Sequence, residues 1–244
     1  MHEAMFFERQ EKGLRCRLCG HNCLVSEGLT GICGARENRN GVLYSRVYGK
    51  LVAEHVDPIE KKPLFHVLSG SRSYSISTMG CNFRCLHCQN ASISQIPKDL
   101  QGELPGTQRT PEEVVRMALD TGCQSISYTY VEPTIFFEFA YDCSVLAAAR
   151  GLKNIFVSNG YMSREAAETL APVLAAINID IKAFSDDFYK KVCGARLQPV
   201  LDTVRTMREL GVWVEVTTLL IPGMNDSREE LQGIASFLVE TDRT

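Results

Sequence analysis

The segment Ser73-Tyr-Ser-Ile-Ser-Thr-Met-Gly-Cys-Asn-Phe-Arg-Cys-Leu-His-Cys-Gln-Asn90 joins a predicted strand to a loop that carries three cysteines. Residues 73–78 alternate polar and bulky side chains, which favours a strand, and Gly80 ends it. Cys81, Cys85 and Cys88 then follow with C-x3-C-x2-C spacing. If the strand belongs to a (β/α) barrel, the loop lies at the face where such barrels hold their active sites. The segment therefore predicts the first strand of such a fold and the position of a reactive centre.

Three thiolates in one loop can bind three irons of a [4Fe–4S] cluster, which leaves the fourth iron without a protein ligand. By analogy with catalytic metal sites that keep an open position, this arrangement indicates reactivity rather than electron storage alone. Two other interpretations stay open. One is a zinc ion whose fourth ligand comes from His87 or another residue, and the other is a set of reduced cysteines with a structural role only.

The segments that follow alternate between strands and helices. Thr110 is predicted to cap a helix that begins with Pro111, and Glu113 completes a capping box. Further strands are expected at 125–130, 154–158, 177–181 and 212–220, and further helices at 134–150, 163–170, 199–210 and from Asp226 or Ser227 to about Val239. Five strands that alternate with helices predict a parallel sheet with right-handed crossovers, which is all or part of a (β/α) barrel.

Five such units cannot close an eight-stranded barrel, and the chain stops at Thr244 where a sixth strand would begin. An open arc and a truncated barrel both fit this count. We expect truncation after the fifth βα unit, because an uncovered parallel edge strand exposes unpaired backbone groups. The expected fold class is α/β, with a partial (β/α) barrel at residues 71–244 and a small Cys-rich segment with short strands at residues 1–70.

Composition limits the kinds of partner. The chain has 26 Lys and Arg against 29 Asp and Glu, a formal charge of −3, and 45% hydrophobic residues, which excludes a disordered chain. Without a basic cluster or a long apolar run, neither nucleic acid nor a membrane is expected as a partner. We expect a cytoplasmic protein whose cysteines are reduced, so that clustered cysteines bind metal rather than form disulfides.

The cysteine loop, with His87 just before its last cysteine, resembles the signature of the radical S-adenosylmethionine (SAM) superfamily, from about Ser73 to the end of the chain. The resemblance implies that Cys81, Cys85 and Cys88 ligate a [4Fe–4S] cluster and that SAM binds the open iron. It also implies that one-electron reduction cleaves SAM to methionine and a 5′-deoxyadenosyl radical, and that the region of His87 approaches the adenine. Because this homolysis needs no protein acid or base, no catalytic residue is nominated.

Two further strand ends resemble SAM-binding segments of this superfamily. Glu132, in Tyr128-Thr-Tyr-Val-Glu-Pro-Thr134, matches the acid of a Gly-Gly-Glu-Pro segment in which both glycines are replaced here. The alternative is that Glu132 only caps the following helix. Ser158 and Asn159 resemble the Thr-Asn of the Thr-Asn-Gly segment in glycyl-radical activating enzymes, which implies contacts to the SAM ribose and carboxylate.

The fourth predicted strand carries two more candidates, Asp180 and Lys182, which resemble the Asp-Leu-Lys segment of the same enzymes. The two-residue period of a strand places both on one face. A buried lysine needs a partner, so Lys182 is expected to meet either Asp180 or the SAM carboxylate. A purely structural Asp–Lys pair is the open alternative.

A second group of cysteines, Cys16, Cys19, Cys23 and Cys33, precedes the predicted barrel. The C-x2-C-x3-C-x9-C spacing is neither that of a zinc ribbon nor that of a ferredoxin, so zinc, an auxiliary iron–sulfur site, free thiols and redox pairs all stay open. Together with residues 128–134 and 191–195, this group resembles the radical SAM component of the AmmeMemoRadiSam system, a relative of the pyruvate formate-lyase activating enzymes.

The leading hypothesis is a radical SAM enzyme that abstracts hydrogen from an unidentified substrate, with a partner protein as one candidate. A reductant of the flavodoxin or ferredoxin type is the expected electron donor. The first alternative is an activating enzyme for a glycyl-radical protein similar to pyruvate formate-lyase. The second is an iron–sulfur or zinc module for binding or electron transfer, without SAM chemistry.

Overall fold

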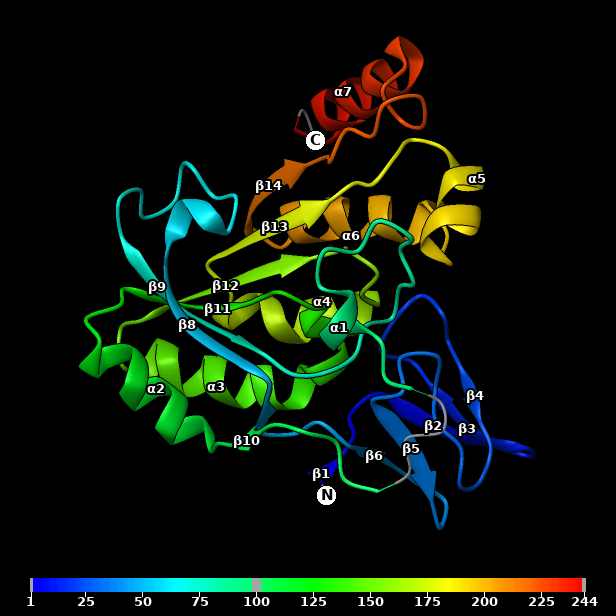
Figure 1. The fold of residues 1–244 in the computed structure, drawn as a ribbon, viewed down its shortest axis with the longest axis vertical. Coiled ribbons are helices and arrows are strands. Elements are labelled where there is room, and N and C mark those ends of the chain that lie inside the picture. Colours follow the sequence, from blue (N-terminus) through cyan, green and yellow to red (C-terminus); the bar gives the residue numbers. More distant parts are fainter. Residues whose placement is uncertain (1, 98–101, 243–244) are drawn as a thin grey trace.

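A six-stranded sheet forms the centre of the computed structural model, which describes residues 2–97 and 102–242 (Figure 1). Its strands lie in the order β14, β13, β12, β11, β9 and β8. Five of them are parallel: β9 (Arg72–Ser77), β11 (Ser125–Tyr128), β12 (Lys153–Ser158), β13 (Ala176–Asp180) and β14 (Trp213–Thr217). The predicted α/β class with a parallel sheet is therefore confirmed. Among the described residues the sheet is open, and truncation of a larger barrel stays a prediction.

The sixth strand, β8 (Ala53–Pro58), pairs antiparallel with β9 and covers the edge that β9 would otherwise expose. Its side chains do not alternate cleanly between buried and exposed, which explains why the sequence predicts only short strands in this region. Because β8 belongs to the central sheet, that sheet draws on residues before 70. The division of the chain into 1–70 and 71–244 stays a prediction.

Three helices begin at the polar residues that the sequence places at their starts, whereas α3 and α6 have no side-chain cap. Helix α2 (Pro111–Asp120) has the capping box of Thr110 and Glu113, and α4 (Arg164–Leu170) is capped by the Ser163 hydroxyl. The Ser227 hydroxyl accepts a hydrogen bond from the backbone of Glu230 and starts α7 (Arg228–Asp242). The remaining helices and turns are α1 (Ala91–Ser94), α3 (Phe137–Ala149), α5 (Asp186–Phe188), α6 (Gln198–Glu209), η1 (Ile59–Lys61), η2 (Pro133–Phe136), η3 (Ala171–Val173) and the π-turn η4 (Tyr189–Cys193). No helix in the described part of the chain has the length and apolarity needed to cross a membrane.

The two faces of the sheet differ in chemistry. On the helix side, Ile76, Tyr128, Phe156 and Ile177 are neighbours in register and fully buried, and α2 and α3 pack against these strands. Each such side chain stabilises the fold by about 1.5–3 kcal/mol on burial. The other face carries small polar residues on β9 and β11, of which Ser73, Ser75, Ser77, Ser125 and Ser127 are fully buried. The helices therefore cover one face. The other face is polar on β9 and β11, whereas Ile155 on β12 and Ala176 on β13 form a small apolar cluster with Ile59 and Leu64.

The N-terminal strands form small antiparallel sheets beside the carboxyl ends of the parallel strands (Figure 1). They are β1 (His2–Glu3), β2 (Phe7–Gln10), β3 (Gly13–Cys16), β4 (Leu24–Val25), β5 (Arg36–Arg39) and β6 (Val42–Ser45), and a ribbon of β7 (Lys50–Leu51) and β10 (Thr107–Gln108) lies nearby. The backbone of Gly20 donates a hydrogen bond to Tyr161 (3.0 Å), and Ser163 donates one to Leu18 (2.9 Å). These contacts fasten the N-terminal unit, defined as residues 2–45, to the residues that follow β12.

Candidate functional site

The loop with the three cysteines leaves the carboxyl end of β9, where the sequence predicts it. Gly80 has a φ of +110°, and a Cβ at this position would lie 3.2 Å from the carbonyl oxygen of Cys33. Its backbone N–H donates to Ile93 in α1 (2.8 Å). Further along, the Asn90 amide donates to the carbonyl of Tyr130 just beyond β11 (2.6 Å). Only glycine fits the start of this loop, and its end is tied to the neighbouring strand.

The three thiols are free, partly buried, and surrounded by different strand ends. Cys81 Sγ lies 3.9 Å from Asn159 Nδ2, just after β12. Cys85 contacts the thiol of Cys193 at the end of η4, and the carbonyl of Cys193 accepts a hydrogen bond from Arg84 (2.8 Å). The loop that follows β9 is therefore enclosed by the segments that follow β11, β12 and β13.

The thiols differ in acidity. Burial raises the pKa of the Cys81 thiol, and the charge of Glu132 adds to that effect. The hydrogen bond from Cys193 lowers the pKa of Cys85 against the effect of burial, and the Lys182 ammonium lowers it further. Cys193 is fully buried, as expected of a core thiol. Its contact with Cys85 has no signal in the sequence, because the two residues belong to separate segments.

Glu132 connects the ends of β11 and β12. Its side chain accepts hydrogen bonds from the backbone N–H of Thr134 (3.0 Å) and of Asn159 (2.7 Å), and from the hydroxyls of Thr134 (2.6 Å) and Ser158 (2.9 Å). Burial raises the pKa of this carboxyl, and the four donors oppose that shift. Glu132 thus caps η2, as the structural alternative requires. It also holds Asn159, whose amide donates to Asn82 Oδ1 beside Cys81 (2.7 Å).

Asp180 and Lys182 form an ion pair at the end of β13, with 2.5 Å between Oδ2 and Nζ. Burial lowers the pKa of Lys182, but Asp180 more than offsets this, so the pKa is raised and the side chain keeps its charge. His87 lies close to this pair. Burial lowers the pKa of its imidazole, and the charge of Lys182 lowers it further. Among the described residues, His87 Nδ1 is buried without a hydrogen-bond partner. The structure thus brings these three predicted residues together beside Cys85.

A buried polar cluster on the sheet is absent from the sequence predictions. Asp57 Oδ2 on β8 accepts hydrogen bonds from Lys62 Nζ (2.6 Å) and from the Tyr130 hydroxyl (2.5 Å), and Lys62 Nζ lies 4.6 Å from the centroid of the Tyr130 ring. Tyr130 has a φ of +67°, which is strained for a non-glycine residue. Lys62 is five residues from Asp57, but Tyr130 is 73 residues away, and the pairing of β8 with β9 places Asp57 beside it.

The donor set fits the predicted cluster in its chemistry. Within the described residues no group of three or more His, Cys, Asp or Glu side chains is already arranged as a metal site. The three thiols nevertheless come from one loop, and Lys182 supplies a positive charge beside Cys85. Thiolates are the usual ligands of iron–sulfur clusters, and three of them leave one iron open. The buried, unpartnered Nδ1 of His87 is available to a ligand bound next to the loop.

Comparisons with known proteins identify the family of this chain. The family model described as Radical SAM superfamily matches residues 75–238. An uncharacterised protein of Methanocaldococcus jannaschii is 49% identical over 239 residues, covering 98% of this chain and 70% of the relative. A pyruvate formate-lyase-activating enzyme of Clostridium pasteurianum is 24% identical over 165 residues, covering 65% of this chain and 66% of the relative. This chain therefore spans about two thirds of both relatives.

Among solved structures, Streptococcus suis SuiB bound to the precursor peptide SuiA has the same fold over 68% of this chain and 36% of its own, with a TM-score of 0.53 and 16% identity. At that identity the likeness concerns the fold alone. The matched residues include the second half of β9, the loop with Cys81, Cys85 and Cys88, and every strand from β11 onward. Because it covers more than half of the chain, and a relative is 49% identical over nearly all of it, the chain belongs to the radical SAM superfamily.

Proposed function

We propose that this protein is an enzyme that reductively cleaves SAM at a [4Fe–4S] cluster held by Cys81, Cys85 and Cys88, and that it abstracts hydrogen from a substrate. One observation carries the proposal. The three free thiols lie in a loop at the carboxyl end of β9, and the segments that follow β11, β12 and β13 contact that loop. This is the end of a parallel sheet at which (β/α) folds place their chemistry.

The residues around the loop have distinct roles in this proposal. When bound, the cluster supplies the electron that cleaves SAM to methionine and a 5′-deoxyadenosyl radical. Lys182 offers an ammonium to a carboxylate, and Asp180 keeps it charged. Glu132 fixes Ser158 and Asn159 at the end of β12 and is therefore a positioning residue. Ser158 and Asn159 are the polar residues proposed to face SAM. His87 Nδ1 is the free polar atom next to the loop.

The test is anaerobic reconstitution with iron and sulfide. Electron paramagnetic resonance (EPR) of the reduced protein is recorded with and without SAM, and 5′-deoxyadenosine is assayed. We expect a signal that shifts with SAM, and nucleoside that is lost when Cys81, Cys85 and Cys88 are changed to Ala. The matched control changes the buried Cys123 and Cys143 to Ala and should retain both. A cluster signal that ignores SAM would refute the proposal and favour a binding or electron-transfer module.

A second candidate function is activation of a glycyl-radical protein, which is the activity named for the Clostridium pasteurianum relative. Two segments of this chain, Ser158-Asn159 and residues 180–182, resemble segments of those enzymes, and this also supports the candidate. Its test is a glycyl-radical EPR signal on a pyruvate formate-lyase-like protein incubated with the reconstituted enzyme and SAM. If the enzyme cleaves SAM and no such signal forms, this candidate is wrong and the primary proposal stands.

Partners and location follow from the same proposal. Cleavage of SAM requires a reductant, and a flavodoxin or ferredoxin is the proposed donor. A peptide or protein substrate is supported by the peptide complex of SuiB. Membership of the AmmeMemoRadiSam system rests on the cysteine group of the N-terminal unit and on residues 128–134 and 191–195. It stays a proposal, as does a cytoplasmic location.

A further inference from the structure

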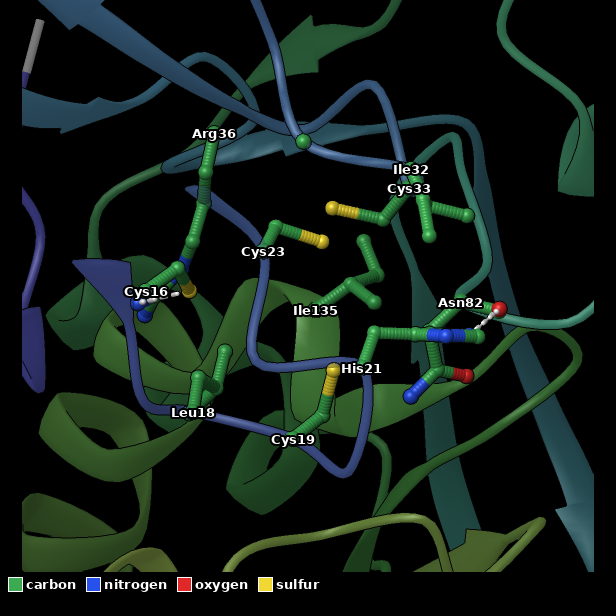
Figure 2. A pocket seen from close by; sticks show the side chains of 11 residues that line it. Cys16, Leu18, Cys19, His21, Cys23, Ile32, Cys33, Arg36, Asn82 and Ile135 are labelled. Carbon is green, nitrogen blue, oxygen red and sulfur yellow. Dashed lines mark hydrogen bonds between the residues drawn. The ribbon is translucent and has the colours of Figure 1, made fainter. Parts of the chain in front are cut away.

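The four cysteines of the N-terminal unit surround one small cavity (Figure 2). Cys16 ends β3, Cys19 and Cys23 lie in the turn between β3 and β4, and Cys33 precedes β5. In Figure 2 the side chains of Cys23 and Cys33 point toward each other. The two sulfurs would lie 3.7 Å and 4.0 Å from a Cβ placed on Gly31. The cavity has a volume of about 20 Å³ and is lined by all four cysteines.

The local backbone holds these cysteines in tight turns. Cys16 donates a backbone hydrogen bond to the carbonyl of Cys23 (2.9 Å), and Asn22, with a φ of +48°, donates one to the carbonyl of Cys19 (3.0 Å). On the other arm, Gly34 donates to the carbonyl of Gly31 (2.9 Å) and turns the chain at Cys33. Two tight turns thus bring cysteines from two arms to the lining of one cavity. Among the described residues the sulfurs are not yet spaced as metal ligands, so a bound ion would draw the two arms together.

One charged side chain lies beside the four cysteines. Arg36, with 1% of its side chain exposed, donates to Cys16 Sγ (3.6 Å) and pairs with Glu138. Glu138 already balances the charge of Arg36, so thiolates gathered around the cavity would need a further cation.

We propose that Cys16, Cys19, Cys23 and Cys33 bind one zinc ion in a closed, four-sulfur site. The cavity holds about one water-sized particle, so it admits a single ion, whereas a cube of four irons and four sulfides does not fit without opening the fold. Four thiolates complete the tetrahedral set of a structural zinc site and leave no open position. Zinc displaces the thiol protons to solvent, and the guanidinium of Arg36 faces the resulting negative charge.

The zinc site has a consequence for the loop that carries Cys81. His21, between Cys19 and Cys23, donates from Nε2 to the carbonyl of Asn82 (2.7 Å). On the other arm the carbonyl of Cys33 lies close to Gly80. Both arms of the proposed site thus contact residues on either side of Cys81. Zinc would hold these arms together and fix the loop against the N-terminal unit.

The experiment measures metal content of the full chain by mass spectrometry, in the wild type and in the variant with Cys81, Cys85 and Cys88 changed to Ala. We expect about one zinc per chain in both proteins. Zinc content should fall at least about tenfold in Cys19→Ala and Cys33→Ala, and should not change in Cys123→Ala with Cys143→Ala. Since the loop variant lacks the cluster ligands, its zinc content reports on this site whether or not the proposed function is correct.

If these variants fail to fold, a second measurement on the wild type still tests the proposal. Zinc X-ray absorption of the wild type should show four sulfur neighbours at about 2.3 Å. Iron with sulfide in the loop variant would overturn the proposal in favour of an auxiliary cluster. A disulfide between any two of the four cysteines would overturn the proposal in favour of thiol chemistry. So would protein that is purified in zinc-containing buffer, contains no metal and has four freely reactive thiols.

Discussion

Two regions of this molecule gather cysteines, and they do so in different surroundings. The loop of Cys81, Cys85 and Cys88 lies at the ends of parallel strands, where Asn159, Lys182 and Cys193 surround it. The four cysteines of the N-terminal unit lie instead in tight turns around a cavity of about 20 Å³, with Arg36 as their charged neighbour. Three thiols beside polar strand ends suit a centre that binds a further ligand. Four thiols around a small cavity suit a closed site.

The largest expected difference concerns SAM cleavage. Cys85→Ala removes one of three cluster ligands, so we expect nucleoside formation to fall below detection while zinc stays at about one per chain. Cys23→Ala should do the reverse, with loss of zinc and a cluster signal that still shifts with SAM. The measurements are the nucleoside assay and metal analysis on the same preparations.

The separation of the two cysteine regions is contradicted if either variant loses both metals while circular dichroism shows a folded chain. In that case the cysteines would form one shared centre. Cys143→Ala is the control, because this thiol is fully buried in α3 and belongs to neither group.

The sequence predicts much more of the parallel sheet than of the contacts between these regions. Strands and caps carry local signals, such as the capping box of Thr110 and Glu113, and all five parallel strands lie within a few residues of their expected positions. Strand β8 is missed as part of the sheet, because its burial pattern lacks alternation. The hydrogen bond of His21 to Asn82 and the contact of Cys193 with Cys85 depend on the folded chain, so no local pattern predicts them.

The second prediction concerns the ion pair that joins the N-terminal unit to helix α3. Arg36 on β5 and Glu138 on α3 each have 1% of the side chain exposed, and Glu138 also accepts from the backbone of Met5 (2.8 Å). Arg36→Met leaves a buried carboxylate without its cation, which should lower the free energy of unfolding by about 3–5 kcal/mol. Urea unfolding followed by circular dichroism measures this change.

The matched control is the double variant Arg36→Met with Glu138→Gln. The neutral amide can still accept from Met5, so the double variant should be more stable than Arg36→Met alone. If the two variants unfold at the same urea concentration, Glu138 does not need Arg36, and the ion pair does not hold the N-terminal unit to α3.

The third prediction locates acid sensitivity in the sheet. Burial opposes ionisation of Asp57, but hydrogen bonds from Lys61, Lys62 and Tyr130 outweigh it and hold the pKa of this carboxyl well below its usual 3.8. A lowered pKa in the folded state gives stability that is present above pH 3.8 and is lost as pH falls toward the folded-state pKa. Asp57→Asn should therefore cost about 2 kcal/mol at pH 7 and flatten the loss of stability in acid.

Urea unfolding at pH 7, 3.5 and 2.5 tests this prediction, with Asp187→Asn as the control because its side chain is 70% exposed. An acid slope that stays unchanged in Asp57→Asn would place the sensitive carboxylate elsewhere.

The smallest expected effect concerns the direct link between the two cysteine regions. His21→Ala removes one hydrogen bond to Asn82, which contributes about 1 kcal/mol, so the melting temperature should fall by about 2–4 °C. His55→Ala is the control, because His55 is exposed on β8. If the N-terminal unit positions the cluster loop, His21→Ala should also slow iron and sulfide reconstitution, while His55→Ala should not. Equal reconstitution rates in both variants would mean that the loop is held by Asn159 and Tyr130 alone, and that the two cysteine regions are neighbours without being coupled.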